Sequence, residues 1–290
     1  MEKTKAKVGF LGHLGSFSHE AADKYLTSVG GMFEVVPQDS FPKLFNFNSN
    51  GQRYLIVVPI DNSIEGLVTP VADLLVEADN FVIIGEYILS IKQNLLTLSG
   101  TNLLDIKRIY SHPQALAQCR NFIEKMRDKN KNDIKEIATK STSEAAKIVA
   151  EEKNIFSAAI GGELSALLNH LKIMASDIAD ANNNQTRFLV LVKTAEDLIP
   201  QPSGDDKTFA IFSVENKPGS LVRVLEVFDV LSVNMTMIQS RPSKKQLGEY
   251  VFFVEFEGHR ASSNIAVALD GVRSRSVWLK VLGSYPIFKK

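Results

Sequence analysis

Thr186 and Arg187 are the residues whose types and spacing best suit chemistry on an anion. They precede the apolar run 188–192, which is typical of a buried strand, and they follow the polar segment 180–185, which we expect to be a loop. At such a strand end an Arg can donate two parallel N–H groups to a carboxylate, while the Thr hydroxyl donates to an adjacent oxygen. The pair therefore suits an anionic substrate that loses a hydroxyl. The structural alternative is that Arg187 ties down a loop carbonyl and Thr186 starts the strand.

Four short polar segments, each predicted to follow a strand and to open a helix, are candidate anion sites. They are 12–18, 61–66, 111–114 and 141–144. A helix N-terminus presents unpaired N–H groups and the positive end of its dipole, and loops at the carboxyl ends of strands line the ligand crevice of α/β sheets. Taken singly, each segment is more simply a helix cap, as the capping-box spacing of Ser141 and Glu144 illustrates. Together with Arg187 they predict a cleft for a small, multiply charged ligand.

The sequence calls for neither a cofactor nor a metal. The segment from Gly12 to Gly15 lacks the third glycine of a dinucleotide fingerprint and the lysine of a phosphate-binding loop, and the five histidines show no metal-ligand spacing. Ser18 and His19 are adjacent, so the sequence alone does not make them a nucleophile and its base. The one cysteine, Cys119, falls in a helical apolar pattern that indicates packing.

Composition and charge narrow the class of protein further. The 290 residues include 33 Lys and Arg against 33 Asp and Glu, so no polyanion-binding surface is indicated and nucleic acid is not expected as a partner. Residues 1–7 lack the apolar stretch of a signal peptide, and no apolar run approaches the roughly 18 residues that span a bilayer. A single cysteine allows no internal disulfide and fits a reducing compartment. We therefore expect a cytoplasmic protein without a membrane segment.

The elements that must position these residues alternate between short strands and amphipathic helices. Strands are predicted near 8–11, 33–36, 55–58, 106–110, 134–137, 156–160 and 188–192, and helices near 18–28, 67–77, 113–127, 143–152 and 162–170. This alternation indicates an α/β fold with mostly parallel sheets. The long apolar stretch 82–98 can carry the chain from one lobe to another as extended strands, and the strand at 188 then returns it. Two lobes with a cleft between them are predicted.

A second, smaller domain is expected after a linker. Residues 200–206 contain two prolines, a glycine and small polar residues without periodicity. Beyond them the pattern predicts strands at 208–214, 234–239, 250–256 and 277–282, with helices at 220–231 and 264–272. This βαββαβ order is the ferredoxin-like plan.

The ordered motifs resemble those of a known enzyme family, the prephenate dehydratases, over nearly the whole chain. The motifs are Gly12-x-x-Gly15-Ser16-Phe17-Ser18-His19, Val58-Pro59-Ile60-Asp61-Asn62-Ser63, Ser111-His112-Pro113-Gln114, Ser141-Thr142-Ser143-Glu144 and Asn184-x-Thr186-Arg187-Phe188. The C-terminal part resembles the family's ACT regulatory domain through Asn216-Lys217-Pro218-Gly219-Ser220-Leu221 and Gln239-Ser240-Arg241-Pro242. The chain departs from the family's usual residues at His13, Leu14, Asp61 and Gln239.

The resemblance implies an architecture and a reaction. It implies a two-lobed, periplasmic-binding-protein-like catalytic domain at 6–195, with lobes at 6–95 plus 186–195 and at 96–185. A linker at 196–206 and an ACT domain at 207–290 would follow. The implied reaction is decarboxylation and dehydration of prephenate to phenylpyruvate in phenylalanine biosynthesis. Thr186 would assist the leaving hydroxyl, Arg187 would bind a carboxylate and Phe188 would form an apolar wall. The implied substrate-binding residues are Ser16, Asn62, Ser63, Ser111, Gln114, Ser141 and Thr142.

The resemblance also implies regulation and assembly. Phenylalanine would bind between paired ACT domains of a homodimer or homotetramer. Backbone donors of the turn at Pro218, Gly219, Ser220 and Leu221 would hold its carboxylate, and the segment Gln239, Ser240, Arg241 and Pro242 would close the site. Because the family usually has Glu where this chain has Gln239, we expect weaker or altered feedback.

Three other functions fit parts of the sequence. An arogenate dehydratase would act on a substrate that carries an amino group in place of the keto group, and the sequence does not decide between the two. A non-aromatising prephenate decarboxylase would share the catalytic domain, although Thr186 and a feedback domain speak against it. A two-lobed protein that binds a small anion without converting it is the alternative outside enzymes.

Overall fold

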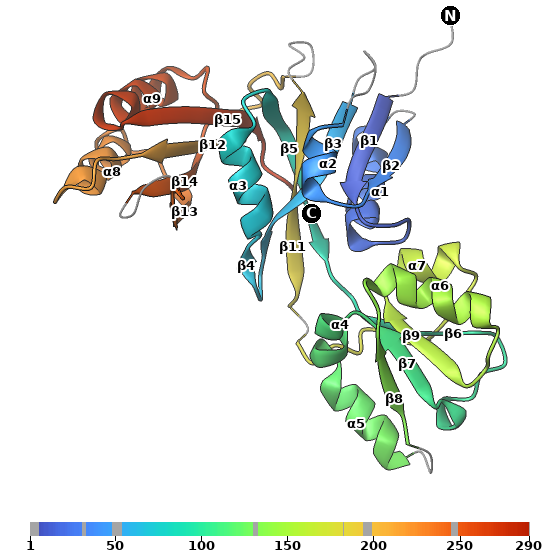
Figure 1. The fold of residues 1–290 in the computed structure, drawn as a ribbon. Helices are drawn as coiled ribbons and strands as arrows, with labels where there is room; N and C mark the ends of the chain where they lie inside the picture. Colours follow the sequence, from blue (N-terminus) through green and yellow to red (C-terminus); the bar gives the residue numbers. More distant parts are fainter. Residues whose placement is uncertain are drawn as a thin grey trace, which may run out of the picture. The chain divides into compact units, whose positions relative to one another are not determined.

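The structure is a computed structural model that describes residues 6–30, 33–47, 54–129, 133–181, 183–193, 199–244 and 249–289 (Figure 1). The chain divides into two compact units. The first unit comprises Met1–Val71 and Ile88–Phe188, and the second comprises Ala72–Tyr87 and Leu189–Lys290. The first residues of the predicted linker, 196–198, lie outside the described ranges.

The first sheet has the strand order β2-β1-β3-β11-β5, with β4 paired to β3. Its strands are β1 (Ala6–Leu11), β2 (Phe33–Gln38), β3 (Tyr54–Asn62), β4 (Gly66–Leu67), β5 (Phe81–Ser90) and β11 (Gln185–Lys193), and the helices between them are α1 (Phe17–Val29), α2 (Phe41–Phe45) and α3 (Thr69–Glu77). β1 runs parallel to β2 and β3. The runs 54–58 and 188–192 are buried throughout, which explains why they are apolar without alternation.

The second sheet has the order β10-β6-β9-β7-β8. Its elements are β6 (Asn94–Thr97), η1 (Leu103–Asp105), β7 (Arg108–Ser111), α4 (Pro113–Gln118), α5 (Arg120–Lys129), β8 (Lys135–Ala138), α6 (Thr142–Glu152), β9 (Ser157–Gly161), α7 (Glu163–Leu168) and β10 (Lys172–Ala175). β7 is parallel to β8 and β9, whereas β6 is antiparallel to β9 and β10. Cys119 packs in the core of this sheet, and burial raises the pKa of its thiol to about 12, so the prediction of a packing role is confirmed.

The C-terminal elements follow the predicted βαββαβ order. They are β12 (Asp206–Ser213), α8 (Ser220–Val230), β13 (Met235–Pro242), β14 (Tyr250–Glu257), α9 (Ser263–Arg275) and β15 (Trp278–Pro286). The sheet order is β13-β14-β12-β15, with every pairing antiparallel. Apolar residues of α8 and α9, among them Val224, Phe228 and Leu269, pack against strand residues such as Phe212 and Phe256.

Several predicted elements need correction. The sheets are mixed rather than mostly parallel. The predicted helix 113–127 is broken at Cys119 into α4 and α5. The segment 61–66 does not open a helix, because it is the turn between β3 and the short strand β4, and α3 begins only at Thr69. Gln185 belongs to β11 and not to the loop before it. The elements α2, β4, η1 and β10 were not predicted, since each is too short to show periodicity.

Among the helices of the described ranges, none combines the length and the apolar character that crossing a bilayer requires.

Candidate active site

A cavity of about 330 Å³ in the first unit collects residues from both sheets and from the segments that join them. It is lined by Ser16, Phe17, Ser18, Pro59, Asn62, Glu65, Val68, Ile91, Gln93, His112, Gln114, Ala115, Gln118, Lys140, Ser141, Thr142, Asn184, Thr186 and Phe188. Most of the polar members are neutral hydrogen-bonding side chains, while Lys140 adds a positive charge and Glu65 a negative one. We call this the polar cavity.

Three helices begin at the wall of the polar cavity, as the sequence predicted. Ser16 caps α1 by accepting from His19 N at 3.2 Å, and Ser141 caps α6 by accepting from Glu144 N at 3.0 Å. His112 caps α4 through its Nδ1, which accepts from Gln114 N at 3.3 Å. The positive ends of three helix dipoles and the adjacent Lys140 therefore favour an anion in this cavity.

Asn62 is the centre of the polar contacts in the cavity. Its Oδ1 accepts from Ile64 N at 3.0 Å and from Glu65 N at 3.1 Å. Because backbone N–H groups can only donate, these bonds fix the amide orientation. Nδ2 must then face Thr186 Oγ1 at 2.8 Å and Asn184 Oδ1 at 2.9 Å. Thr186 receives a hydrogen bond from Asn62, so its own hydroxyl hydrogen is directed to another acceptor.

Alternation along β11 separates the three residues that the sequence grouped together. Thr186 and Phe188 are buried and line the polar cavity, but Arg187 is only half-buried and does not line it. Successive side chains of a strand point to opposite faces. The structure therefore does not bring Arg187 to the substrate cavity beside Thr186.

Two of the predicted substrate-binding serines are used within the protein instead. Ser63 Oγ donates to Asn183 O at 2.9 Å and accepts from Gln185 N at 2.9 Å. Ser111 is fully buried, and its Oγ donates to Ile160 O at 2.8 Å. Neither side chain lines the polar cavity, because Ser63 holds the turn after β3 to the start of β11 and Ser111 ties β7 to β9. The predicted residues Ser16, Asn62, Gln114, Ser141 and Thr142 do line it.

The structure adds cavity residues that the sequence did not single out, notably Gln93, Lys140 and Glu65, and it brings in Asn184, which the sequence named only as part of a motif. The sequence contains a signal for Lys140, since a cation directly before a helix cap can reach the anion that the helix N-terminus binds. For the role of Glu65 the sequence contains no such signal. Its Oε1 accepts from Gln114 Nε2, which is a contact between residues 49 positions apart that only the fold creates.

His19 does not act as a base for Ser18. Its Nδ1 accepts from Gly15 N at 3.0 Å, and its ring stacks on Phe10 with centroids 4.9 Å apart. Burial lowers the pKa of His19 below its usual value, against the opposing effects of Asp23 and Glu20. The histidine is a neutral, structural partner of the turn before α1.

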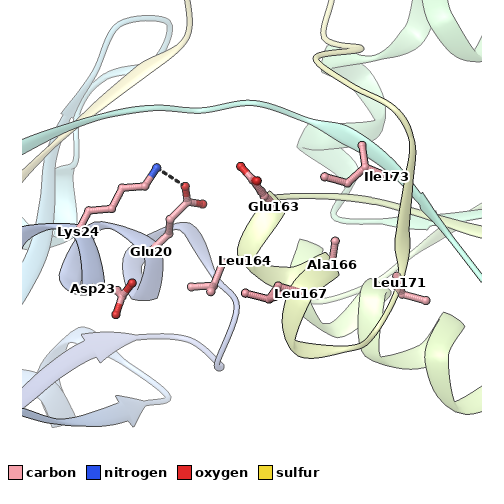
Figure 2. Close-up of a pocket in the computed structure, with 9 residues that line it drawn as sticks. All are labelled: Glu20, Asp23, Lys24, Glu163, Leu164, Ala166, Leu167, Leu171 and Ile173. Atoms are coloured by element: carbon pink, nitrogen blue, oxygen red, sulfur yellow. Dashed lines mark hydrogen bonds and ion pairs between the residues drawn. The ribbon is translucent and has the colours of Figure 1, made fainter. Parts of the chain in front are cut away.

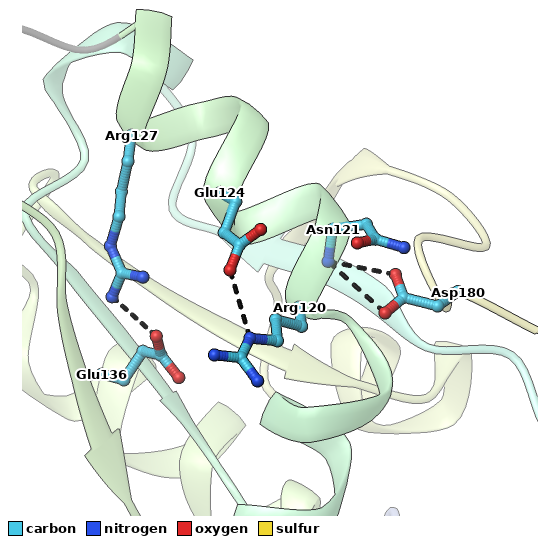
Figure 3. Close-up of polar contacts among 6 residues, drawn as sticks. All are labelled: Arg120, Asn121, Glu124, Arg127, Glu136 and Asp180. Atoms are coloured by element: carbon cyan, nitrogen blue, oxygen red, sulfur yellow. Dashed lines mark hydrogen bonds and ion pairs between the residues drawn. The ribbon is translucent and has the colours of Figure 1, made fainter.

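The segment that carries Asn184 and Thr186 back to the first sheet is anchored at Asp180. Asp180 N donates to Gln118 O at 2.7 Å, and the Asp180 carboxylate accepts from Asn121 N at 3.2 Å (Figure 3). At the other end of α5, Arg127 pairs with Glu136 of β8 at 2.6 Å. The outgoing segment is bonded to the returning one through Ile91 N to Asn184 O and Ile178 N to Gln93 O, both at 2.8 Å. The predicted pair of connections between two lobes is confirmed.

A second cavity, of about 560 Å³, lies between α1 and α7 with β10 (Figure 2). Its lining combines apolar side chains such as Leu164, Leu167 and Ile173 with Glu163 and the ion pair of Lys24 and Glu20. No predicted site residue lines it. Its carboxylates make it a poor site for an anion, so the polar cavity is the candidate active site.

The predicted effector residues occupy two elements of the second unit. Gly219 has φ 79°, a conformation that favours glycine, and it precedes α8. Ser220 Oγ accepts from Arg223 Nη2 at 3.0 Å. On the edge strand β13, Gln239 and Arg241 share one face, and Arg241 pairs with Asp73 of α3 at 3.2 Å.

No cluster of three or more side chains suited to a metal is found in the part of the chain that the structure describes.

The chain combines an α/β cavity for a small anion with a ferredoxin-like domain, which is the organisation of an enzyme with an appended regulatory domain. A family model for prephenate dehydratase matches residues 8–196, and one for the ACT domain matches residues 208–269. The chain belongs to the prephenate dehydratase family.

Relatives along the full chain agree with this assignment. A prephenate dehydratase of Methanocaldococcus jannaschii is 38% identical over 276 residues, which cover 94% of this chain and 96% of that protein. A bifunctional chorismate mutase/prephenate dehydratase of Aquifex aeolicus is 38% identical over 282 residues, or 97% of this chain and 74% of that protein. The solved structure of prephenate dehydratase from Arthrobacter aurescens in complex with L-Phe has a TM-score of 0.83 at 31% identity, covering 97% of this chain and 90% of that one.

Proposed function

We propose that this chain converts prephenate to phenylpyruvate, carbon dioxide and water, with Thr186 as the hydrogen-bond donor to the departing hydroxyl. The contact of 2.8 Å from Asn62 Nδ2 to Thr186 Oγ1 carries the proposal. By occupying a lone pair of Thr186, it leaves the hydroxyl hydrogen for the substrate. The donor and the helix N-termini lie around one cavity, which is what a reaction of an anion with a leaving hydroxyl requires.

The reaction balances with one proton. Cleavage of the ring carbon–carboxylate bond releases carbon dioxide and leaves its electron pair in the ring. The ring carbon–oxygen bond breaks, and the oxygen leaves with a proton delivered through Thr186, so prephenate dianion and one proton give phenylpyruvate anion, carbon dioxide and water. A threonine hydroxyl is a weak acid compared with the usual catalytic acids. We therefore assign Thr186 the role of donor or relay for a proton from solvent.

The remaining roles follow from position. The N-termini of α1, α4 and α6, together with Lys140, are proposed to hold the two carboxylates, with Ser16, Gln114, Ser141 and Thr142 as further polar contacts. Phe188 forms part of the apolar wall. For Arg187 we propose a supporting role in β11 without substrate contact, because it does not line the polar cavity.

Regulation and assembly are also proposed. Phenylalanine is proposed to bind between ACT domains of two copies, in a homodimer or homotetramer. The turn from Pro218 to Leu221 would come from one copy and the strand segment from Gln239 to Pro242 from its partner. The relative crystallised with L-Phe supports the effector, and the left-handed turn at Gly219 supports the placement of the backbone donors. The cytoplasm is the proposed compartment, which suits the single free cysteine.

A direct assay tests the function. The purified chain is mixed with prephenate, and phenylpyruvate is followed by its absorbance, with and without phenylalanine. We expect turnover by the wild type and a fall in kcat of at least about a hundredfold in Thr186→Ala. Thr27→Ala is a matched control, because the Thr27 hydroxyl donates to Asp23 O within α1 and Thr27 does not line the polar cavity.

Two outcomes would contradict the proposal at different levels. Prephenate that binds but stays unchanged would indicate the alternative of a binding protein, and a product without an aromatic ring would indicate a decarboxylase. Phenylpyruvate formation that Thr186→Ala leaves intact would remove Thr186 from the reaction while the enzyme class survives.

A further inference from the structure

Gln93 holds a buried acceptor at the polar cavity that the protein does not use. The residue is only 3% exposed, it lines the cavity, and its Oε1 has no hydrogen-bond partner among the described residues. Its backbone is fixed, because Gln93 O accepts from Ile178 N at 2.8 Å. A buried acceptor without a partner costs about 1–3 kcal/mol. A ligand that brings a donor to this oxygen recovers that cost.

The connections between the sheets set the distance from Gln93 to Thr186. Ile91 N donates to Asn184 O where β5 has ended and β11 is about to begin, and β5 and β11 are neighbours in the sheet. The two segments therefore run antiparallel. From this bond, Thr186 lies two residues in one direction and Gln93 two residues in the other. At ~3.3 Å per residue of extended backbone their Cα atoms are up to about 13 Å apart, so we infer that the two side chains contact different parts of a ligand in the cavity.

The substrate also carries two different groups at its opposite ends, which can face Thr186 and Gln93. Its ring hydroxyl and its three-carbon side chain are attached to opposite carbons of a six-membered ring. If Thr186 serves the hydroxyl, as the proposed function requires, Gln93 lies towards the side chain. Prephenate and arogenate differ only there, since prephenate carries a keto oxygen and arogenate an ammonium group. An ammonium group donates to the amide oxygen, whereas a keto oxygen offers that atom no hydrogen and can only accept from Nε2 after the amide turns.

We propose that Gln93 is a specificity-determining residue whose Oε1 accepts a hydrogen bond from the ammonium group of arogenate, so that Gln93 raises the activity on arogenate relative to that on prephenate. The inference rests on the proposed function, because it takes the orientation of the substrate from Thr186. Gln93 does not contact the reacting bonds. Its effect therefore falls on substrate choice and on KM more than on kcat.

Two variants test the inference by the ratio of kcat/KM for arogenate to kcat/KM for prephenate. Gln93→Leu keeps a similar volume but removes the acceptor, and it should lower the ratio by about tenfold or more. Gln93→Glu keeps an acceptor and adds a negative charge that attracts ammonium, and it should raise the ratio by about tenfold. For each variant, the kcat/KM values for the two substrates are measured on one preparation, so the fraction of folded enzyme cancels in their ratio.

Thr97→Val is the matched control. Thr97 Oγ1 is another buried group without a partner in the described part of the chain, but Thr97 does not line the polar cavity, so its loss should leave the ratio unchanged. A ratio that stays within about twofold of the wild type in both Gln93 variants, while both substrates are converted, would overturn the role of Gln93 alone. If the wild type converts neither substrate, the proposed function fails, and the inference about Gln93 fails with it.

Discussion

Two buried polar clusters, one in each unit of the chain, use their hydrogen-bonding capacity in opposite ways. The cluster of the first unit joins Asn62, Asn184 and Thr186. The cluster of the second unit joins Lys207, Glu86 and Glu255. The first consists of short neutral side chains at a cavity, and the second of charged side chains that are packed away from solvent.

In the second cluster the charges are matched by close partners. Lys207 Nζ lies 2.8 Å from Glu86 Oε1 and 3.2 Å from Glu255 Oε1. Tyr285 OH donates to Glu255 Oε2 at 3.0 Å, and Phe288 N donates to Glu86 Oε1 at 3.1 Å. The carboxylate side chains are 1% and 3% exposed. Such a cluster holds β5, β12 and β14 together.

The first cluster presents hydrogen-bonding capacity to a ligand in the polar cavity. The oxygen of Asn62 accepts from two backbone N–H groups, and its nitrogen donates towards Thr186, Asn184 and Gln185 O. Thr186 lines the cavity, and because its oxygen accepts from Asn62, its hydroxyl can still donate to a ligand there. A polar group with an unused donor beside a cavity is a binding group, whereas a polar group with every partner in the protein is a structural one. Exposure alone does not separate the two cases, since Asn184 and Thr186 of the first cluster are buried like Glu86 and Glu255 of the second. The comparison predicts that changes in the second cluster cost stability and that changes in the first cost activity.

Lys207→Met should give the largest effect, on stability. The substitution leaves Glu86 and Glu255 as two buried carboxylates without their shared cation, and breaking a buried ion pair in this way costs about 3–5 kcal/mol. Thermal unfolding followed by circular dichroism should show a clear fall in Tm, while kcat of the remaining folded enzyme on prephenate stays within about twofold. Lys217→Met is the matched control. Its pair with Glu215 at 2.7 Å is exposed on both sides, so the expected loss is below about 1 kcal/mol. A large loss of kcat with an unchanged Tm in Lys207→Met would break the comparison.

Asn62→Asp should have a smaller effect, and on activity instead. A carboxylate can still accept from Ile64 N and Glu65 N, so the turn after β3 is retained. It cannot donate to Thr186, however, and it will instead accept the hydroxyl hydrogen that the substrate needs. We expect kcat on prephenate to fall about 10–100-fold, with little change in Tm.

The control for Asn62→Asp is Asn102→Asp. Asn102 is exposed and caps η1, where its Oδ1 accepts from Leu104 N at 3.1 Å, and it does not line the polar cavity. That variant should keep full activity. If Asn62→Asp matched it in kcat, the orientation of the Thr186 hydroxyl would have to be explained without Asn62.

The sequence predicted the order of the major elements because that order is written in local patterns. The apolar run 188–192 and the caps Ser16 and Ser141 are examples that the structure confirms. Arg187 shows the limit of such patterns. Its type and its neighbour suggested a carboxylate clamp, but the pairing of β11 starts at Gln185 and so places Arg187 on the other face from Thr186. A shift of a strand boundary by a few residues decides which side chains share a face.

Gln93 shows why the rest of the candidate site was not predicted. It lies in one of the two segments that join the sheets, 91 positions before Asn184 in the other, and it belongs to no periodic pattern. The two residues meet the same cavity only because Ile91 and Asn184 are bonded where the chain leaves and re-enters the first sheet. Long-range pairing of this kind has no local signal.

Gln239→Glu should give the smallest effect, and it extends the comparison to the edge of the second unit. Gln239 shares a face of β13 with Arg241, whose guanidinium pairs with Asp73 at 3.2 Å and is 14% exposed. A carboxylate at position 239 provides a charged partner for the ammonium group of phenylalanine, where the amide provides a neutral one, and charge-assisted hydrogen bonds are about twice as strong as neutral ones. The concentration of phenylalanine that halves dehydratase activity should therefore fall several-fold, with uninhibited kcat unchanged. Gln201→Glu, an exposed position, controls for the added charge. If phenylalanine inhibits Gln239→Glu no better than the wild type, position 239 belongs with the structural polar groups of the second unit and not with the binding ones.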